Sequence, residues 1–336
     1  MRLIKAAMIV LASLTSAARA EPSGAARVQP EPAPPARPAA PRALSAETLS
    51  DAEFAFVVRV GKHRLWRSRV SAPHGAKLGR IQSLAPGDAF APIARSPLPA
   101  ELAPLQGARV RLQTAGGEEC EVTLKSWGVL AEYNSAPEGE DEKLSERQLA
   151  RRAFTTDESA ELRYAVDISE ESAGCAEALW ARLATLPKIA SYPVEELKGA
   201  ALERLRPLLY KTASYIEAQK RYREEQEKGS WDRLEFTSFV GFAAHVGSVR
   251  HLIGDMNYFE GCSEFSGHTI GFYEQLPKGH REQPNELSDT FVPQRALDLN
   301  GDGFPEWISN YHLVGWDGTH LTILRNVEPT TWWCPC

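Results

Sequence analysis

The sequence predicts a β-rich α+β protein. Short segments in which apolar and polar residues alternate recur along most of the chain, while segments of helical periodicity are fewer and gather near the middle. The chain has 336 residues, and at about 100–200 residues per domain this length predicts two folded domains. We expect an N-terminal small sheet or barrel with helices, a helical connector and a C-terminal antiparallel β region.

The first 20 residues have the pattern of a secretory signal peptide. Arg2 and Lys5 precede a short apolar segment, and Ala-Arg-Ala at residues 18–20 forms a small-residue cleavage motif. From residue 21 to residue 46 the chain consists mainly of Pro, Ala and Arg, a composition that predicts a disordered, semi-extended tether. The N-terminus therefore predicts a secreted protein, either periplasmic or extracellular.

Residues 47–190 form the first predicted domain, which we expect to be a β-rich α+β unit. Alternation predicts its strands at residues 54–60, 109–112, 120–124, 127–133 and 162–168. Ser145 and Gln148 have the spacing of a capping box, which predicts that a helix begins there. A second helix is predicted over residues 176–186, because leucines recur at helical spacing and Pro187 can end the helix.

Residues 191–229 are predicted to form a helical connector. Apolar residues recur at helical spacing from Glu195 to Lys228, and Pro207 is expected to kink or split the helix. The end of this segment is nearly all charged, which favours a solvated connector over a coiled-coil partner helix.

The second predicted domain, residues 230–336, is rich in strands. These are expected at residues 236–246, 249–253, 267–276, 290–299, 305–314 and 319–324.

One nine-residue loop, Asp298–Glu306, has the spacing of a calcium site. Oxygen-bearing side chains occupy its positions 1, 3, 5 and 9, and the glycine at position 6 permits a sharp turn. The predicted ligands are Asp298, Asn300, Asp302, the carbonyl of Phe304, and Glu306. Such a set of oxygens suits Ca²⁺, which takes about six to eight of them. The site is expected to be structural, because protein oxygens at so many positions leave little room for a substrate.

Two other interpretations compete with a calcium site. Its twelfth residue is Ser309, whereas an EF-hand has a bidentate Glu there, so the loop is not an EF-hand. Asn-Gly followed by Asp-Gly also favours a simple hairpin turn. A simple turn, however, requires neither Asp298 nor Glu306.

Residues 296–326 resemble a single FG-GAP or VCBS-type repeat, the calcium-carrying blade unit of integrin-like β-propellers. The resemblance rests on Asp298, Asn300, Asp302 and Gly303, while Glu306 stands where the repeat usually has aspartate. A propeller closes from several blades, and residues 255–261 repeat only the first half of the motif. The resemblance thus implies one blade-like calcium hairpin within the C-terminal β region.

A second candidate site is a group of histidines and an aspartate in the same domain. His245, His251 and Asp255 are weak candidates for catalysis or zinc binding, and they define the alternative function of a secreted hydrolase with a His/Asp site. Neither a His-Glu-x-x-His motif nor a Gly-x-Ser-x-Gly motif is present. Exposed or hydrogen-bonded histidines are the simpler interpretation, and an enzyme is the less favoured class.

Aromatic residues gather near the C-terminus. Trp307, Tyr311, Trp316, Trp332 and Trp333 could stack on carbohydrate or contact a surface protein, but alternation also predicts that some of them fill the core.

All five cysteines follow the predicted cleavage motif, where an oxidising compartment favours disulfides. We expect a bridge between Cys120 and Cys175, and a second between Cys262 and either Cys334 or Cys336, which leaves one cysteine over.

The formal net charge is -6, and this acidic balance argues against nucleic acid or an anionic membrane as a partner. No second apolar run is long enough for an integral membrane span. Together these features predict a secreted calcium-binding protein that acts as a ligand-binding or cell-surface interaction module, with a structural protein of the envelope as a further possibility.

Overall fold

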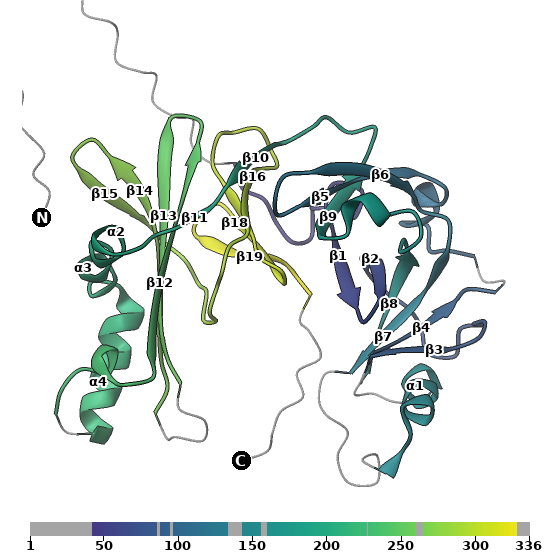
Figure 1. Cartoon of the computed structure of the whole chain (residues 1–336), viewed down its shortest axis with the longest axis horizontal. Helices are drawn as coiled ribbons and strands as arrows, with labels where there is room; N and C mark the ends of the chain where they lie inside the picture. The colour runs from purple at the N-terminus through teal and green to yellow at the C-terminus, as the bar shows by residue number, and fades with distance from the viewer. Residues whose placement is uncertain are drawn as a thin grey trace, which may run out of the picture. The chain divides into compact units, whose positions relative to one another are not determined.

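The computed structural model describes residues 42–85, 88–94, 97–133, 143–155, 160–226, 228–259 and 265–327. All of these residues belong to one compact unit, Ala39–Cys336. Their strands form one sheet of nine strands and two of five, and the ladders between neighbouring strands are antiparallel (Figure 1). The β-rich α+β class is therefore confirmed. The predicted signal peptide and the predicted tether up to residue 41 lie outside the described residues. Arg42, Leu44 and Ala46, at the end of the predicted tether, are instead held by hydrogen bonds to Asp302, Trp316 and Arg325.

The nine-stranded sheet occupies the first predicted domain. Its strands are β1 (Ala55–Val60), β2 (His63–Ser71), β3 (Gln82–Ala85), β4 (Asp88–Pro92), β5 (Arg109–Thr114), β6 (Glu119–Thr123), β7 (Trp127–Tyr133), β8 (Ala160–Asp167) and β9 (Ala178–Leu183). Across the sheet they follow the order β3-β4-β7-β8-β2-β1-β9-β5-β6, which leaves β3 and β6 at the edges. The described strands thus form an open sheet and not a barrel.

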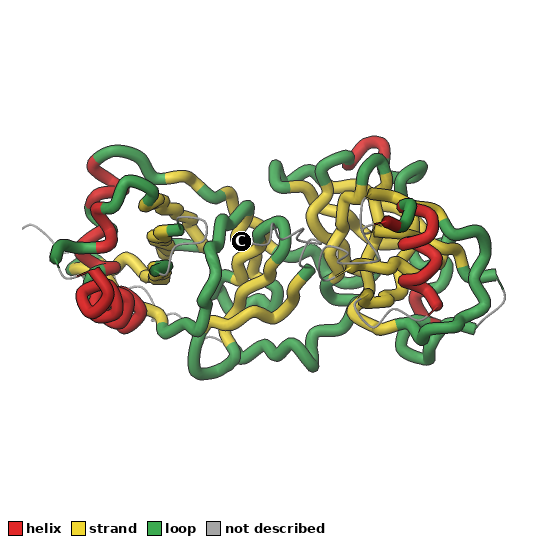
Figure 2. The backbone as a smooth tube through the Cα atoms, turned by 90° about the horizontal axis from the view of Figure 1, so that it is seen from below, coloured by secondary structure: helices red, strands yellow, loops and turns green. Residues whose placement is uncertain are grey.

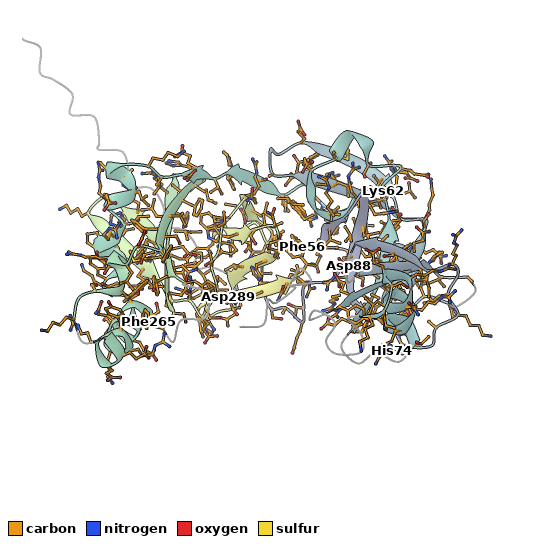
Figure 3. All side chains as sticks on the ribbon, turned by 60° about the horizontal axis from the view of Figure 1, so that its bottom comes forward. Phe56, Lys62, His74, Asp88, Phe265 and Asp289 are labelled. Atoms are coloured by element: carbon orange, nitrogen blue, oxygen red, sulfur yellow. A yellow bond between two sulfur atoms is a disulfide. The ribbon has the colours of Figure 1, made fainter. Side chains whose placement is uncertain are left out.

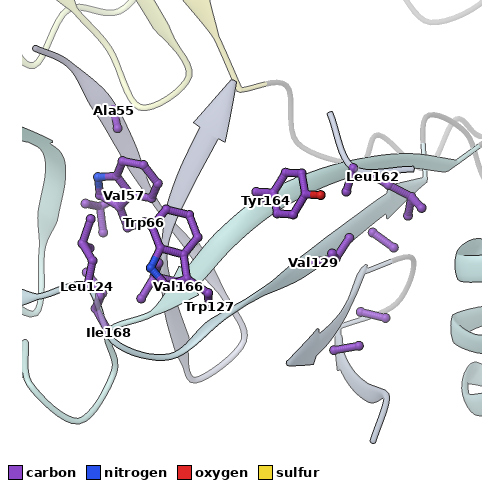
Figure 4. Packing of buried hydrophobic residues seen from close by; sticks show 14 of the residues in the cluster. Ala55, Val57, Trp66, Leu124, Trp127, Val129, Leu162, Tyr164, Val166 and Ile168 are labelled. Atoms are coloured by element: carbon purple, nitrogen blue, oxygen red, sulfur yellow. The ribbon is translucent and has the colours of Figure 1, made fainter. Parts of the chain in front are cut away.

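Large apolar side chains fill one face of this sheet. Trp66 of β2 and Trp127 of β7 both lie opposite Val166 of the strand between them, and their rings meet edge to face with centres 5.5 Å apart (Figure 4). Helix α1 (Glu146–Thr155) adds Leu149 and Phe154 to the same buried cluster.

The start of α1 agrees with its predicted capping box. The Oε1 atom of Gln148 accepts hydrogen bonds from the Ser145 hydroxyl at 2.6 Å and from the Ser145 N–H at 2.9 Å. The Gln148 side chain thereby satisfies a backbone donor that the helix itself leaves unpaired.

The predicted helix over residues 176–186 is wrong. Residues 178–183 form β9, which lies between β1 and β5. Leu179 and Leu183 are four residues apart, a spacing that lies on one side of a helix but also on one side of a strand. The segment forms a strand because it pairs with neighbouring strands on both of its edges. Trp180, next to Leu179, stacks on Phe54 with ring centres 5.6 Å apart.

The segment predicted as a helical connector begins with two short strands, β10 (Ala190–Pro193) and β11 (Glu195–Glu196). Three helices follow: α2 (Ala200–Glu203), α3 (Arg206–Leu209) and α4 (Ala213–Gln226). The helical period is split as expected, since Pro207 lies in the first turn of α3, where its missing N–H costs nothing. The helices pack on the sheet that contains β11, with Leu209 and Tyr215 in the buried cluster between them.

Two five-stranded sheets complete the described fold. The first has the order β11-β12-β13-β14-β15, with β12 (Thr237–Val246), β13 (Val249–Tyr258), β14 (Gly267–Leu276) and β15 (Gly279–Gln283). The second, which we call the loop sheet, has the order β10-β16-β17-β18-β19, with β16 (Arg295–Asp298), β17 (Glu306–Ile308), β18 (His312–Trp316) and β19 (Leu321–Asn326). Single-turn 3₁₀ helices lie at Ala103–Leu105, Ala173–Cys175 and Trp231–Arg233. Figure 2 shows the helices at the flanks of the strands.

Several predicted strand limits need correction. The strand expected at 249–253 continues to Tyr258, and only 295–298 of the segment 290–299 is a strand. The strand expected at 305–314 is interrupted, because the Ser309 hydroxyl oxygen accepts hydrogen bonds from the N–H groups of Tyr311 and His312 and holds a turn.

The loop sheet has apolar contacts on both of its faces. Trp307 and Val314 share a buried cluster with Phe272 of β14, in the other five-stranded sheet, and with Phe291, which precedes β16. Ile308 and Leu313 share another with Phe56 of β1, Trp180 of β9 and Phe54, which directly precedes β1. Phe56 is labelled in Figure 3. Any change in the stability of the loop sheet therefore acts on both clusters.

The predicted bridge between Cys120 and Cys175 is present and links β6 to the 3₁₀ helix before β9. Cys262, Cys334 and Cys336 lie outside the described residues. Within the described ranges, no helix combines the length and the apolar character needed to cross a membrane.

Candidate functional site

The predicted calcium loop connects β16 to β17. These strands pair with Leu297 opposite Glu306, so the hairpin brings the first and last predicted ligands to the same end of the ladder. Gly301 and Gly303 have φ values of 72° and 80°, a left-handed conformation that favours glycine. The sequence folds locally into a tight loop because glycine occupies both of these positions.

Backbone N–H groups hold the loop's side-chain oxygens in place. The N–H of Asp302 donates to Asn300 Oδ1 at 3.1 Å, and that of Gly303 donates to Asp298 Oδ2 at 3.2 Å. Phe304 N–H donates to Asp302 Oδ1 at 2.7 Å. The side chains at positions 1, 3 and 5 therefore fold back over the loop's own backbone.

Glu306 is the most unusual group in the loop. Its side chain is turned into the protein and the residue is only 1% exposed, and its Oε2 accepts the Leu299 N–H at 2.7 Å. Burial, and after it the negative charges of Asp302 and Asp298, raise the pKa of Glu306 well above its ordinary value. In the described part of the chain, no Lys, Arg or His forms an ion pair with any of these three carboxylates.

The donor set of the loop fits a hard cation. Asp298 Oδ1 is buried and has no hydrogen-bond partner among the described residues, so one carboxylate oxygen remains available inside the loop. Oxygens from carboxylates, an amide and a backbone carbonyl are the ligands that Ca²⁺ prefers. Asp298 and Asp302 are near enough for their charges to raise the pKa of Glu306, although no three His, Cys, Asp or Glu side chains of the described residues are placed together as a ready metal site.

The structure does not gather the histidine candidates in an open cleft. His251 and Asp255 lie on one face of β13 and are 4% and 1% exposed, whereas His245 is exposed near the end of β12. Asp255 accepts the Phe291 N–H at 2.8 Å and lies 3.3 Å from Nε2 of His268. Asp255 therefore acts as a hydrogen-bonded core residue.

His251 is packed among aromatic rings. Its ring meets those of Phe304 and Trp307 edge to face, with centres 5.6 and 6.5 Å away. Burial lowers the pKa of His251 to about 4, despite the nearby charge of Glu274. The imidazole is thus neutral near pH 7 and occupies the cluster that joins the two five-stranded sheets.

Acid should destabilise the protein through His251. Between a pKa of about 4 in the folded state and about 6.5 in the unfolded state, the unfolded chain binds more protons, so stability is lost as the pH falls through this window. We expect a loss of about 2 kcal/mol between pH 7 and pH 5. Over the same pH change, the free energy of unfolding of a His251→Phe variant should fall by about 2 kcal/mol less than that of the wild type. Urea unfolding at the two pH values measures this difference.

The exposed His74 supplies the matched control. His74→Gln should keep the pH dependence of the wild type, because its side chain is exposed and is not among the groups whose charge acts on His251. An unchanged pH dependence in His251→Phe would contradict the assignment.

Most of the aromatic residues near the loop fill the core. Trp307 is buried, Trp316 is partly buried against Phe304 with ring centres 6.1 Å apart, and Tyr311 is 45% exposed. Trp332 and Trp333 lie outside the described residues. Of the aromatic candidates that the structure describes, Tyr311 is the one exposed to a partner.

Sequence reasoning missed a cavity of about 110 Å³ between β2, β8 and the end of β19. Arginines from separate parts of the chain line it, namely Arg67, Arg69, Arg163 and Arg325, together with Asp51. Glu132 and Glu161 pair with two of these arginines, and backbone carbonyls of residues 46 and 47 accept from the other two. No local pattern marks the group, because its members meet only after the strands pair.

No family model matches this chain, and comparison with curated proteins and with solved structures finds no match. The site is therefore judged on its own geometry.

Proposed function

We propose that the loop Asp298–Glu306 binds calcium and that the protein is a secreted ligand-binding or surface interaction module in which calcium has a structural role. The observation that carries this proposal is the buried carboxylate of Glu306, which lies near two further carboxylates and has no cationic partner among the described residues. A buried charge is costly unless it is paired or binds a metal. A bound cation would satisfy all three acids at once.

Calcium is the cation that best suits this chemistry. The predicted ligands are all oxygens, and extracellular calcium modules commonly work with dissociation constants on the order of 10⁻⁴–10⁻³ M. Asp298, Asn300, Asp302, Glu306 and the carbonyl of Phe304 would hold the ion. In that position it would tie the end of β16 to the start of β17 and so stabilise the loop sheet.

Thermal unfolding with millimolar calcium and with chelator tests the proposal. A ligand present at about 100 times its Kd stabilises the folded state by about 2.7 kcal/mol, so calcium should raise the wild-type Tm. The double variant Asp298→Ala, Asp302→Ala should not respond to calcium. Asp289→Ala, which removes a carboxylate from an exposed position, should respond as the wild type does. A wild-type Tm that calcium leaves unchanged would reduce the loop to a simple turn.

The partner is proposed to be a carbohydrate or a surface protein. Tyr311 supports this, because it is exposed in the turn between β17 and β18, on the sheet that carries the loop. The hydrolase alternative is not carried forward, since His251 and Asp255 are buried and contact core residues: His251 meets the rings of Phe304 and Trp307, and Asp255 accepts the Phe291 N–H.

A further inference from the structure

The residues that lead into the first strand of the nine-stranded sheet contact the calcium loop. Arg42 makes two hydrogen bonds through its backbone: its N–H donates to Asp302 Oδ2 at 2.5 Å, and its carbonyl accepts from Asn300 Nδ2 at 3.2 Å. Two predicted calcium ligands are thus held by one residue that is more than 250 positions away in the sequence.

The next residues continue along the loop sheet. Leu44 donates its N–H to the carbonyl of Trp316 at 2.7 Å, and its side chain packs against the apolar cluster on that face. The carbonyl of Ala46 then accepts from the guanidinium groups of Arg325 and Arg69. We call residues 42–45 the strap. The contacts of Ala46 with the two arginines form the fixed end of the strap.

We propose that the strap competes with calcium for Asp302, so that calcium loading releases the strap from the loop sheet. This inference rests on the proposed calcium function and deepens it. Both carboxylate oxygens of Asp302 already accept an N–H, Oδ1 from Phe304 within the loop and Oδ2 from Arg42 in the strap. A cation on Oδ2 would place its charge against the positive end of the Arg42 N–H dipole.

Asn300 adds a second point of conflict. Its Nδ2 donates to the Arg42 carbonyl while its Oδ1 accepts the N–H of Asp302. If the amide turns Oδ1 toward the ion when calcium binds, Nδ2 moves away from the strap. Release should stop at Ala46, because the two arginine contacts and the buried side chain of Leu49 do not involve the loop.

The coupling must act in both directions, because linkage between two binding equilibria is reciprocal. If calcium weakens the strap contact, removing the contact must strengthen calcium binding by the same factor. Couplings between linked sites commonly amount to about 5–150-fold, and we expect about tenfold here.

A pair of variants at residue 42 of the full chain isolates the competing N–H. Arg42→Pro removes the backbone donor, while Arg42→Ala keeps it and removes only the side-chain charge. Calcium titration by calorimetry should give a Kd about tenfold lower for Arg42→Pro than for Arg42→Ala. In the wild type, hydrogen exchange at the Leu44 amide should become faster when calcium is added.

The possible outcomes separate the strap from the calcium site. Equal calcium affinity in the two variants, or weaker binding by Arg42→Pro, would overturn the competition while leaving calcium binding established. Unchanged exchange at Leu44 in saturating calcium would also overturn it. If neither the wild type nor Arg42→Ala binds calcium, the proposed function itself fails and the strap proposal fails with it.

Discussion

Replacing Glu306 with Gln is expected to abolish stabilisation by calcium without weakening the calcium-free protein. Gln keeps the shape of the side chain and removes a buried acid whose ionisation burial, Asp302 and Asp298 oppose. In chelator, the variant should therefore be at least as stable as the wild type. In calcium at about 100 times the Kd, the wild type should gain about 2.7 kcal/mol that the variant does not gain. Urea unfolding at pH 7 in both conditions measures the two differences.

Glu306→Gln is informative because it should be at least as stable as the wild type in chelator but less stable than the wild type in calcium. Glu235→Gln is the matched control, because Glu235 is exposed and lies outside the loop. It should follow the wild type in calcium and in chelator. A Glu306→Gln variant that is less stable than the wild type by about 2 kcal/mol in chelator would mean that Glu306 stabilises the fold without calcium, and would contradict the interpretation.

Loss of the Cys120–Cys175 disulfide should give the other large effect. The bridge joins residues 55 positions apart, and closing a loop of this length is expected to stabilise the fold by about 4 kcal/mol through the entropy of the unfolded chain. The double variant Cys120→Ala, Cys175→Ala should lose about this amount in chemical unfolding under non-reducing conditions.

Single variants separate the bridge from the packing of its sulfur atoms. Cys175 is buried and Cys120 is partly buried, so each single substitution should cost nearly as much as the double one, since either breaks the bridge. A reducing agent should therefore destabilise the wild type by about 4 kcal/mol more than it destabilises the double variant. A double variant within about 1 kcal/mol of the wild type would show that the bridge adds little.

The sequence predicts those strands best in which alternation is clear over the full length. Residues 127–133 and 267–276 were expected with the limits that the structure has, because each carries a continuous run of strand-forming residues. The strand β9 was missed because its leucines fit either period, and pairing with β1 and β5 decided between them. Tertiary contacts thus override an ambiguous local pattern.

The candidate site also combines features that are visible in the sequence with features that depend on tertiary contacts. The spacing from Asp298 to Glu306 is visible in the sequence because all of its predicted ligands lie in one loop. The burial of Glu306 arises only when the chain is folded, and the contact with Arg42 joins residues far apart in the sequence. Neither feature has a local signal, so neither could be predicted before the fold was known.

The path of the chain at Val194 also sets the order in which the sheets can form. One residue separates β10 from β11, yet β10 pairs with β16 of the loop sheet and β11 pairs with β12 of the other sheet. The partner of β11 follows about 40 residues later, whereas that of β10 follows only after about 100. Contacts so distant in sequence close slowly, and an unpaired strand edge can associate with other chains in the meantime. Folding of the C-terminal half should therefore be limited by capture of β10, and newly made chains are most prone to aggregate before β16 arrives.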